Sequence, residues 1–390
     1  MNRIAVVFNG DLSKNRQGQL NSAICRIKHL QQQCVFDVEA YCIQEYSVGL
    51  LRLIRKEKMP QKKDSALIDG IKVNIIYKKS FFIDVFLETR LKVMPLLRAL
   101  SYKIIARRFR SFDLISGHSI IGGELALSVK KQYGIPYSVT WHGSDIHTLP
   151  VHNTQTKKLV SHILNGASGN IFVSQSLYLT CIELFGGCPN PQVIYNAADS
   201  SFYKFPDAQR NTTREKWGVY QNKVVAYVGN LEAVKNVEQL PIVFQTIQRK
   251  QRDVCFWIIG DGAFRRKLEQ EMKAKNISCV FWGNQQPESM PEYMNCIDVL
   301  ILPSKNESFG MVLVEAIACG ANAVGSNRGG IPEVIGEVNC FELDESFADK
   351  ISDRIVYMLR NKVEQSVNPE FNWSRTAEKE ARLFKEIINR

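Results

Sequence analysis

The 390-residue sequence lacks the paired cysteines that mark most zinc sites and redox centres. Its ten cysteines form no CxxC pair, and no cluster of histidines accompanies them. A chain of this length has enough apolar residues for full cores and needs no disulfide staples, so isolated cysteines are expected to pack as small hydrophobic side chains. We therefore expect no metal site and a reducing, cytoplasmic environment.

Long apolar runs are absent as well. No run reaches the roughly 20 residues of a membrane-spanning helix, and the apolar stretch in the N-terminal MNRIAVVFNGD is too short for a signal peptide. That stretch is typical of a first β-strand instead. Repeats and low-complexity tracts are also missing, so we expect a globular protein. Without a membrane-spanning segment, we expect it to be soluble or peripheral to a membrane. Its length predicts two or three domains.

Acidic residues are scarce in the first part of the chain. Residues 1–150 contain 23 Lys and Arg against 12 Asp and Glu, whereas the rest contains 27 of each. Basic residues cluster at 52–63 and again at 81–110, where apolar and basic residues recur at helical spacing. Such segments can lie on an anionic membrane surface, or they can be solvated helix faces that also pack on their own domain. No nucleic-acid-binding module is recognisable, so nucleic acid is not an expected partner.

A strand–loop–helix pattern runs through the chain twice. Strands that are apolar on both faces indicate parallel sheets covered by helices, and two such runs predict an α/β protein with two doubly wound domains. The polar segment 200–218 separates the runs, and the final FNWSRTAEKEARLFKEIINR predicts an amphipathic helix. The expected strands are 4–8, 36–42, 72–77, 113–117, 137–143, 170–174 and 192–196, then 223–229, 254–260, 279–283, 298–303 and 322–326.

Three polar, glycine-containing loops follow strands of the second run. Ligands of doubly wound sheets bind beyond the carboxyl ends of the strands, so these loops are candidate ligand contacts. They are VGNLEAVKN with Gly229 and Lys235, IGDGAFRRKLE with Gly260 and Gly262, and SKNESFGMV, which opens a helix. The first amides of a helix suit a phosphate, and a nearby lysine would complete a diphosphate site. Each loop alone is also compatible with an ordinary turn.

Glu307 and Glu315 are the candidate functional carboxylates in NESFGMVLVEAIACG. Glu315 stands inside an apolar helix, where burying an unpaired charge costs several kcal/mol. Eight helical residues span about 12 Å, more than the roughly 5–9.5 Å between paired hydrolase carboxylates, so the spacing does not support a hydrolase. We expect Glu307 to face the reacting group and Glu315 to face a hydroxyl-bearing ligand such as ribose. The alternatives are a buried ion pair for Glu315 and a surface cap for Glu307.

Several of these stretches resemble glycosyltransferase family 4, the glycosyl transferases group 1. NESFGMVLVEAIACG followed by VGSNRGGIPEVI is similar to the donor-site signature of that family. VGNLEAVKNVEQL resembles its diphosphate loop, IIGDGAFRRKLE its loop near the nucleotide, and VIYNAADSSFY the segment leading into the linker. DLISGHS and the following GIPYSVTWHGSDI resemble the part of the first domain that carries an active-site histidine. The resemblance covers residues 110–390 well and is weak over 1–110.

The resemblance implies a fold and a reaction. The family has the GT-B fold, two Rossmann-like domains facing each other across a cleft. We expect an acceptor domain over 1–205, a nucleotide-sugar domain over 206–368 and a C-terminal helix, 369–390, that packs back on the first domain. The implied reaction moves a sugar from a UDP- or GDP-sugar to an acceptor hydroxyl with retained configuration. The family's front-face displacement needs no side-chain nucleophile, and no DxD motif is apparent, so we expect no cofactor and no metal.

The family's roles transfer to individual residues of this chain. Glu307 would contact the sugar near its C3 and C4 hydroxyls, Glu315 the ribose, and His142 the reacting sugar. Lys235 would hold the diphosphate and offset the charge of the departing nucleotide. The catalytic set is thus His142, Glu307 and Lys235. The donor-binding set is Gly229, Asn230, Lys235, Gly260, Gly262, Ser308, Phe309, Gly310, Met311, Val312 and Glu315.

The sequence departs from the family pattern in two loops. Asn230 stands where the family usually has arginine, so Lys235 carries more of the charge, or Arg328 or another base substitutes. The N-terminal loop FNGDLSKNRQGQLN lacks the usual paired glycines, and Gly10 and Gly18 are the available replacements.

The acceptor and the class of activity leave alternatives open. The basic first part favours a lipid-linked or oligosaccharide acceptor at the inner face of a bacterial membrane, in surface polysaccharide assembly. Two other functions are compatible with the same site: an epimerase acting on nucleotide sugars, and a non-catalytic protein that binds them.

Overall fold

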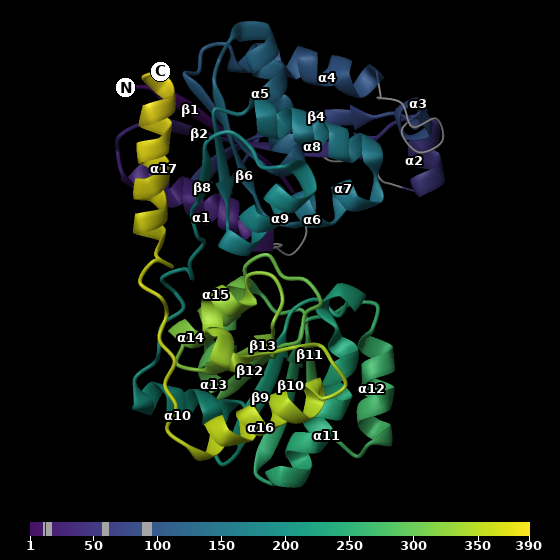
Figure 1. Ribbon diagram of the computed structural model, residues 1–390, viewed down its shortest axis with the longest axis vertical. Helices are drawn as coiled ribbons and strands as arrows, with labels where there is room; N and C mark the ends of the chain where they lie inside the picture. The colour runs from purple at the N-terminus through teal and green to yellow at the C-terminus, as the bar shows by residue number, and fades with distance from the viewer. Residues whose placement is uncertain (11, 13–17, 57–61, 88–95) are drawn as a thin grey trace. The chain divides into compact units, whose positions relative to one another are not determined.

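The chain forms two compact units (Figure 1). The computed structural model describes residues 1–10, 12, 18–56, 62–87 and 96–390. The first unit comprises Met1–Tyr195 together with Trp373–Arg390, and the second comprises Asn196–Asn372. The junctions therefore fall after Tyr195 rather than after residue 205, and before Trp373 rather than before residue 369.

An eight-stranded sheet in the order β3-β4-β2-β1-β5-β6-β7-β8 forms the centre of the first unit. All neighbouring strands are parallel except β3 and β4, which pair antiparallel. The strands are β1 (Arg3–Asn9), β2 (Asp37–Ser47), β3 (Ser65–Ile68), β4 (Ile71–Ser80), β5 (Leu114–His118), β6 (Tyr137–Trp141), β7 (Gly169–Phe172) and β8 (Pro191–Val193).

The antiparallel strand β3 was not among the expected strands. Asp69 and Gly70 connect it to β4, with φ of 50° and 80°, and Ile68 pairs with Ile71 across this two-residue loop. A two-residue loop with positive φ at both positions is the turn that Asp-Gly favours in hairpins. The Asp-Gly dipeptide in LIDGIKV is therefore the sequence feature that indicates the hairpin containing this edge strand.

The helices of the first unit cover its sheet. Their bounds are α1 (Gly18–Gln32), α2 (Leu50–Arg55), α3 (Phe82–Phe86), α4 (Leu96–Ala106), α5 (Ser119–Tyr133), α6 (Ser144–His147), α7 (Leu149–His152), α8 (Thr154–Gly166), α9 (Gln175–Phe185) and α17 (Trp373–Ile388). The basic segment 81–110, with its helical spacing, contains α3, α4 and a 3-10 turn at Arg107–Phe109. Residues 57–61 and 88–95 of the two basic segments lie outside the described residues.

The C-terminal helix α17 packs on α1. The core beneath it includes Leu383, Phe384 and Ile387 from α17. The buried Arg26 of α1 pairs with Glu380 of α17 and donates a 2.7 Å hydrogen bond to the carbonyl of Ile194. Because removing one partner of a buried ion pair leaves an uncompensated charge, this contact ties the end of the chain to the first unit.

A six-stranded parallel sheet in the order β11-β10-β9-β12-β13-β14 forms the centre of the second unit. Its strands are β9 (Lys223–Val228), β10 (Val254–Ile259), β11 (Cys279–Gly283), β12 (Val299–Leu302), β13 (Asn322–Ser326) and β14 (Cys340–Phe341). Its helices are α10 (Asp207–Lys216), α11 (Leu240–Lys250), α12 (Arg265–Ala274), α13 (Met290–Cys296), α14 (Met311–Ala318), α15 (Ile331–Ile335) and α16 (Phe347–Arg360).

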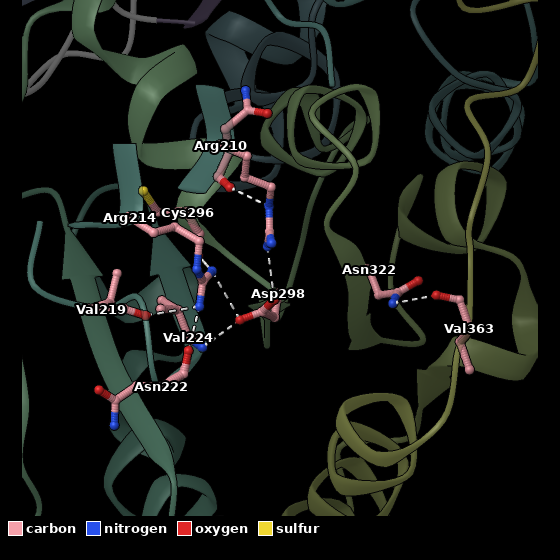
Figure 2. Close-up of polar contacts among 10 residues, drawn as sticks. Arg210, Arg214, Val219, Asn222, Val224, Cys296, Asp298, Asn322 and Val363 are labelled. Carbon is pink, nitrogen blue, oxygen red and sulfur yellow. Dashed lines mark hydrogen bonds and ion pairs between the residues drawn. The ribbon is translucent and has the colours of Figure 1, made fainter. Parts of the chain in front are cut away.

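Asp298 joins α10 to the amino-terminal edge of this sheet (Figure 2). Its carboxylate lies 2.9 Å from Arg210 and 3.3 Å from Arg214 of α10, and it accepts a 2.8 Å hydrogen bond from the amide of Val224. Arg214 also donates to the carbonyl of Val219 at 3.1 Å. This part-buried network lies at the end of the strands opposite the candidate site.

Candidate active site

The three candidate loops of the second unit meet at the carboxyl ends of β9, β10 and β12. These strands are neighbours in the sheet. The amide of Gly229, after β9, donates to the carbonyl of Ile259 at 2.9 Å, and the amide of Lys305, after β12, donates to the carbonyl of Val234 at 2.8 Å. The sheet order thus brings together residues that are far apart in the sequence.

Gly260 and Gly262 allow the loop after β10 to approach the loop after β9. A Cβ atom on Gly260 would lie 2.0 Å from the carbonyl oxygen of Gly229, and one on Gly262 would lie 2.5 Å from that of Leu231. Both distances are below any real contact, and Gly260 has a φ of 130°, which favours glycine. These glycines are therefore required for loop packing, whatever ligand lies against them.

Lys235 and Glu307 form an ion pair across two of the loops. Lys235 ends a 3-10 turn at Ala233–Lys235, and its Nζ lies 2.6 Å from Oε2 of Glu307. The two side chains are 26% and 15% exposed, so the pair is reachable from solvent but largely enclosed. Asn230 has an exposed side chain, and its carbonyl accepts a 2.8 Å hydrogen bond from the hydroxyl of Tyr227.

The helix α14 begins directly after the Glu307 loop. Gly310 is its N-cap and has no side chain to cap the first amides, which have no partner within a helix. Phe309 is buried and packs edge-on against Phe371, with 5.1 Å between ring centroids. Met311 and Val312 are half-buried. The helix therefore presents the start of its backbone, rather than long polar side chains, beside Lys235 and Glu307.

Glu315 is half-buried on the second turn of α14. Burial raises its pKa to about 7, and the negative charge of Asp199 acts in the same direction. Among the described residues its carboxylate has no ion-pair or hydrogen-bond partner. The alternative of an internal ion pair is therefore not observed in that part of the chain.

Arg328 was one candidate to replace the missing arginine of the diphosphate loop. Its guanidinium lies 2.6 Å from Glu342 and donates to the carbonyl of Asn327 at 2.8 Å, and its side chain is 41% exposed. Two acceptors thus already hold it at the surface. Lys235 is the basic side chain in direct contact with Glu307.

His142 belongs to the first unit and directly follows β6. Its amide donates to Asp145 at 3.1 Å, and the amide of Gly143 donates to the same carboxylate at 2.7 Å. Its ring Nε2 lies 3.0 Å from Nδ1 of His118, the last residue of β5. Of the N-terminal loop, Gly10 and Gly18 are described, whereas 11 and 13–17 lie outside the described residues.

His118 and Asp145 were not among the expected site residues. Both stand in segments already noted, DLISGHS and WHGSD. The available signal was that His118 ends the strand β5 and that Asp145 lies in the turn and short helix that follow β6, a neighbouring strand. A sequence does not show which strands are adjacent, so the two histidines could not be paired from it.

Two family models match the chain. The model for Glycosyltransferase Family 4 matches residues 62–202, and the model for Glycosyl transferases group 1 matches residues 209–379. Together they cover most of both units.

Individual proteins are similar to the chain as well. The N-acetyl-alpha-D-glucosaminyl L-malate synthase of Bacillus anthracis is 28% identical over 274 residues, which are 68% of this chain and 70% of that protein. The lipopolysaccharide 1,2-N-acetylglucosaminetransferase of Salmonella typhimurium is 24% identical over 176 residues, 40% of this chain and 46% of that protein.

The crystal structure of Anabaena HepE in complex with UDP and glucose has a similar fold. Its TM-score is 0.70 at 18% identity, and the alignment covers 100% of this chain and 99% of that one. This likeness shows the fold, and the two family models show the family. The chain belongs to glycosyltransferase family 4, the glycosyl transferases group 1, and is a glycosyltransferase with the GT-B fold.

Proposed function

We propose that this glycosyltransferase moves a sugar from a nucleotide diphosphosugar to an acceptor hydroxyl with retained anomeric configuration. The observation that carries the proposal is the half-buried carboxylate of Glu315, held in the apolar helix α14 with no cation next to it among the described residues. A ribose supplies two hydroxyl donors for such a carboxylate. The solved structure of HepE contains UDP and glucose, which supports a donor of this class.

The roles follow from the chemistry of each group. Lys235 and the first amides of α14, at Phe309–Val312, bind the diphosphate, since cations and helix N-termini both favour anions. Glu307 accepts hydrogen bonds from the sugar hydroxyls. The departing phosphate takes the proton of the acceptor hydroxyl, so no side-chain nucleophile and no metal ion are needed. Lys235 stabilises the negative charge that develops on the phosphate.

The Lys235–Glu307 pair makes the donor site testable with two variants. Lys235→Met removes the cation and should weaken binding of UDP or GDP by about 10–100-fold, as expected for a lost hydrogen bond between charged groups. Glu307→Gln should leave that affinity equal or higher, because Lys235 is no longer neutralised, yet lower the transfer rate by about 100-fold or more. Calorimetry with UDP and GDP, and transfer assays with a panel of nucleotide sugars, measure the two effects.

The matched control is Glu292→Gln. Glu292 pairs with Lys216 at 2.6 Å in the same unit, so its loss removes an ion pair of the same length outside the site and should change neither quantity. Undiminished transfer by Glu307→Gln, or undiminished nucleotide binding by Lys235→Met, would contradict the proposal. Conversion of a nucleotide sugar to its epimer without an acceptor would indicate the epimerase instead, whereas nucleotide release that depends on the acceptor would exclude it.

We further propose a lipid-linked acceptor at an anionic membrane surface, in bacterial surface polysaccharide assembly. The amide of Val48, before α2, donates to the carbonyl of Ser80, before α3, at 3.1 Å, so the two helices start from adjacent strand ends. Their large apolar side chains are exposed: Leu50, Leu53, Ile54, Phe82, Ile83 and Phe86. We call these six residues, with the exposed Arg52, Arg55 and Lys56, the apolar–basic surface.

This combination favours a lipid surface over a solvated helix face. Exposed apolar side chains insert at the headgroup boundary, and each nearby lysine or arginine adds about 1 kcal/mol of attraction to anionic lipid. No helix among residues 1–10, 12, 18–56, 62–87 and 96–390 is long and apolar enough to cross a membrane. The name of the Salmonella relative, a lipopolysaccharide glycosyltransferase, supports a role in surface polysaccharide assembly.

A further inference from the structure

His118 and His142 form a hydrogen-bonded pair in the first unit. The two residues end β5 and follow β6, and 3.0 Å separates Nδ1 of His118 from Nε2 of His142. Their rings lie nearly parallel, with centroids 5.2 Å apart and planes at 24°. His118 is 2% exposed. Buried polar groups are normally hydrogen-bonded, and the hydrogen-bond partner of the His118 ring is the candidate site residue His142.

Both rings are held neutral by their surroundings. Burial lowers the pKa of His118 to about 3, and the positive charge of Arg26 acts in the same direction. Burial lowers the pKa of His142 well below its ordinary value, with further contributions from His118 and Arg26. Arg26 itself is held by Glu380 of α17. The carboxylate that faces this turn, Asp145, accepts from the backbone of His142 rather than from its ring.

Neutrality of both rings restricts their tautomers. One bridging nitrogen must carry the proton and the other must accept it, because a neutral imidazole has one N–H group. If Nε2 of His142 donates, both rings carry their proton on Nε2; if Nδ1 of His118 donates, both carry it on Nδ1. The pair therefore has one common tautomer, and the remaining nitrogen of His142 has a single role, either donor or acceptor.

The backbone around the pair is also fixed. Asp145 holds the turn that follows β6 through two amides, and Ser119, which follows His118, donates its hydroxyl to Asp145. Ser119 has a φ of 58°, a conformation that costs a non-glycine residue about 1–2 kcal/mol. Gln19 of α1 donates to Ser119 in turn. These contacts orient the main chain, whereas the ring of His142 has His118 as its hydrogen-bond partner within the described residues.

We propose that His118 is a positioning residue for His142: it sets the orientation and tautomer of that ring, and so decides whether the free nitrogen donates to or accepts from the substrate. The inference rests on the proposed role of His142 at the reacting sugar. His118 does not itself touch the substrate. Its effect on the reaction is carried entirely through the 3.0 Å hydrogen bond.

Two substitutions of His118 separate positioning from packing. His118→Leu fills the buried position with an apolar side chain and removes the hydrogen bond to His142. His118→Asn retains a polar group near the position of Nδ1. The chain contains six histidines, so long-range proton–nitrogen spectra of histidine-labelled protein can resolve each ring. His142→Asn identifies the resonance of His142 itself.

We expect both rings of the unmodified protein to show the same neutral tautomer from pH 5 to pH 8. In His118→Leu, the His142 signal should shift toward a tautomer mixture, and the transfer kcat should fall at least about tenfold, as for other losses of tautomer control. The KM for the donor should change little, and His118→Asn should restore part of kcat. Opposite tautomers, or a His142 signal and a kcat that His118→Leu leaves unchanged, would overturn the inference.

The spectra distinguish this inference from the proposed function. A chain that transfers no sugar but shows the common tautomer would contradict the function and leave the histidine pair intact. A chain that transfers sugar and keeps its rate in His118→Leu would contradict the pair alone. If both variants unfold below room temperature, the spectra of the unmodified protein still test the common tautomer.

Discussion

Glu315 is the residue at which sequence and site chemistry are most closely linked. Its neighbours on α14 are apolar, and burial raises its pKa to about 7. A carboxylate with a raised pKa destabilises the folded protein where it is ionised, because the unfolded chain ionises it at a lower pH without that cost. The residue is thus unfavourable for stability above pH 7, and hydroxyl donors from a ligand would offset this cost.

The first residue-scale prediction concerns pH. Hydroxyl donors favour the ionised carboxylate, so nucleotide binding should release a proton from Glu315 near neutral pH. The affinity for UDP or GDP should therefore rise between pH 6 and pH 8 and then level off. Calorimetry in buffers of different ionisation enthalpy measures the released protons.

Glu315→Gln provides the comparison, since the phosphates of the nucleotide titrate near pH 6 in both proteins. The variant should bind more weakly at pH 8 and lack the contribution of Glu315 to the pH profile. It should also be more stable than the unmodified protein at pH 8, by an amount that shrinks as the pH falls through 7 toward 5. Parallel binding profiles for the two proteins would contradict the assignment.

At the scale of elements, the site depends on how loops from neighbouring strands support one another. The loop after β13 packs against the Glu307 loop, and the amide of Gly330 donates to the carbonyl of Glu307 at 2.8 Å. Gly329 has a φ of 58°, and a Cβ atom there would lie 1.9 Å from the carbonyl oxygen of Glu307. The loop after β13, which follows α14 in the chain, therefore helps to set the position of Glu307.

Gly329→Ala should displace the Glu307 loop and lower the transfer rate by about tenfold or more, because misplaced catalytic groups lose orientation. Gly218→Ala is the control: Gly218, in the same unit, also has a positive φ, of 69°, but a Cβ atom there would meet open space. Both substitutions place a Cβ atom at a positive φ, which is unfavourable for a residue other than glycine. Thermal unfolding and transfer assays of both variants separate strain from loop displacement, and equal activities would argue against the supporting role.

At the scale of the whole molecule, charge is distributed unequally along the chain. The entire excess of +11 arises in residues 1–150, the part that contains the apolar–basic surface. An excess of positive charge spread evenly along the chain would favour solubility alone. In the apolar–basic surface, the exposed Arg52, Arg55 and Lys56 accompany six exposed apolar side chains, which favours a partner that is both anionic and apolar.

Liposome flotation tests this whole-molecule prediction. The protein should float with vesicles that contain phosphatidylglycerol and much less with pure phosphatidylcholine, and added salt should weaken the binding. Leu53→Asp should reduce recovery with the anionic vesicles. The control Leu67→Asp changes an equally exposed leucine on β3, which pairs with Lys72 at the far end of β4, and should not. Equal recovery with and without anionic lipid would reject the membrane surface.

Much of the fold could be predicted from the sequence because it depends on local patterns. Two-sided apolar strands alternating with helices determine two parallel sheets, and the strands from 4–8 to 322–326 all lie in or overlap observed strands. The carboxylate inside an apolar helix and the glycine-bearing loops likewise indicated a ligand site before any contact was known. The short edge strands β3 and β14 were missed, because so few residues at a sheet edge carry little pattern of their own.

Only the tertiary structure decided which side chains meet. Lys235 and Glu307 are 72 positions apart, and His118 and His142 are 24 apart, and each pair exists because the sheet makes their strands neighbours. The order of strands in a sheet is a property of long-range packing, whereas the type of each element follows from its own periodicity. The sequence by itself therefore determined what the elements are and which loops are candidates for ligand binding, and the tertiary structure determined which side chains of those loops pair.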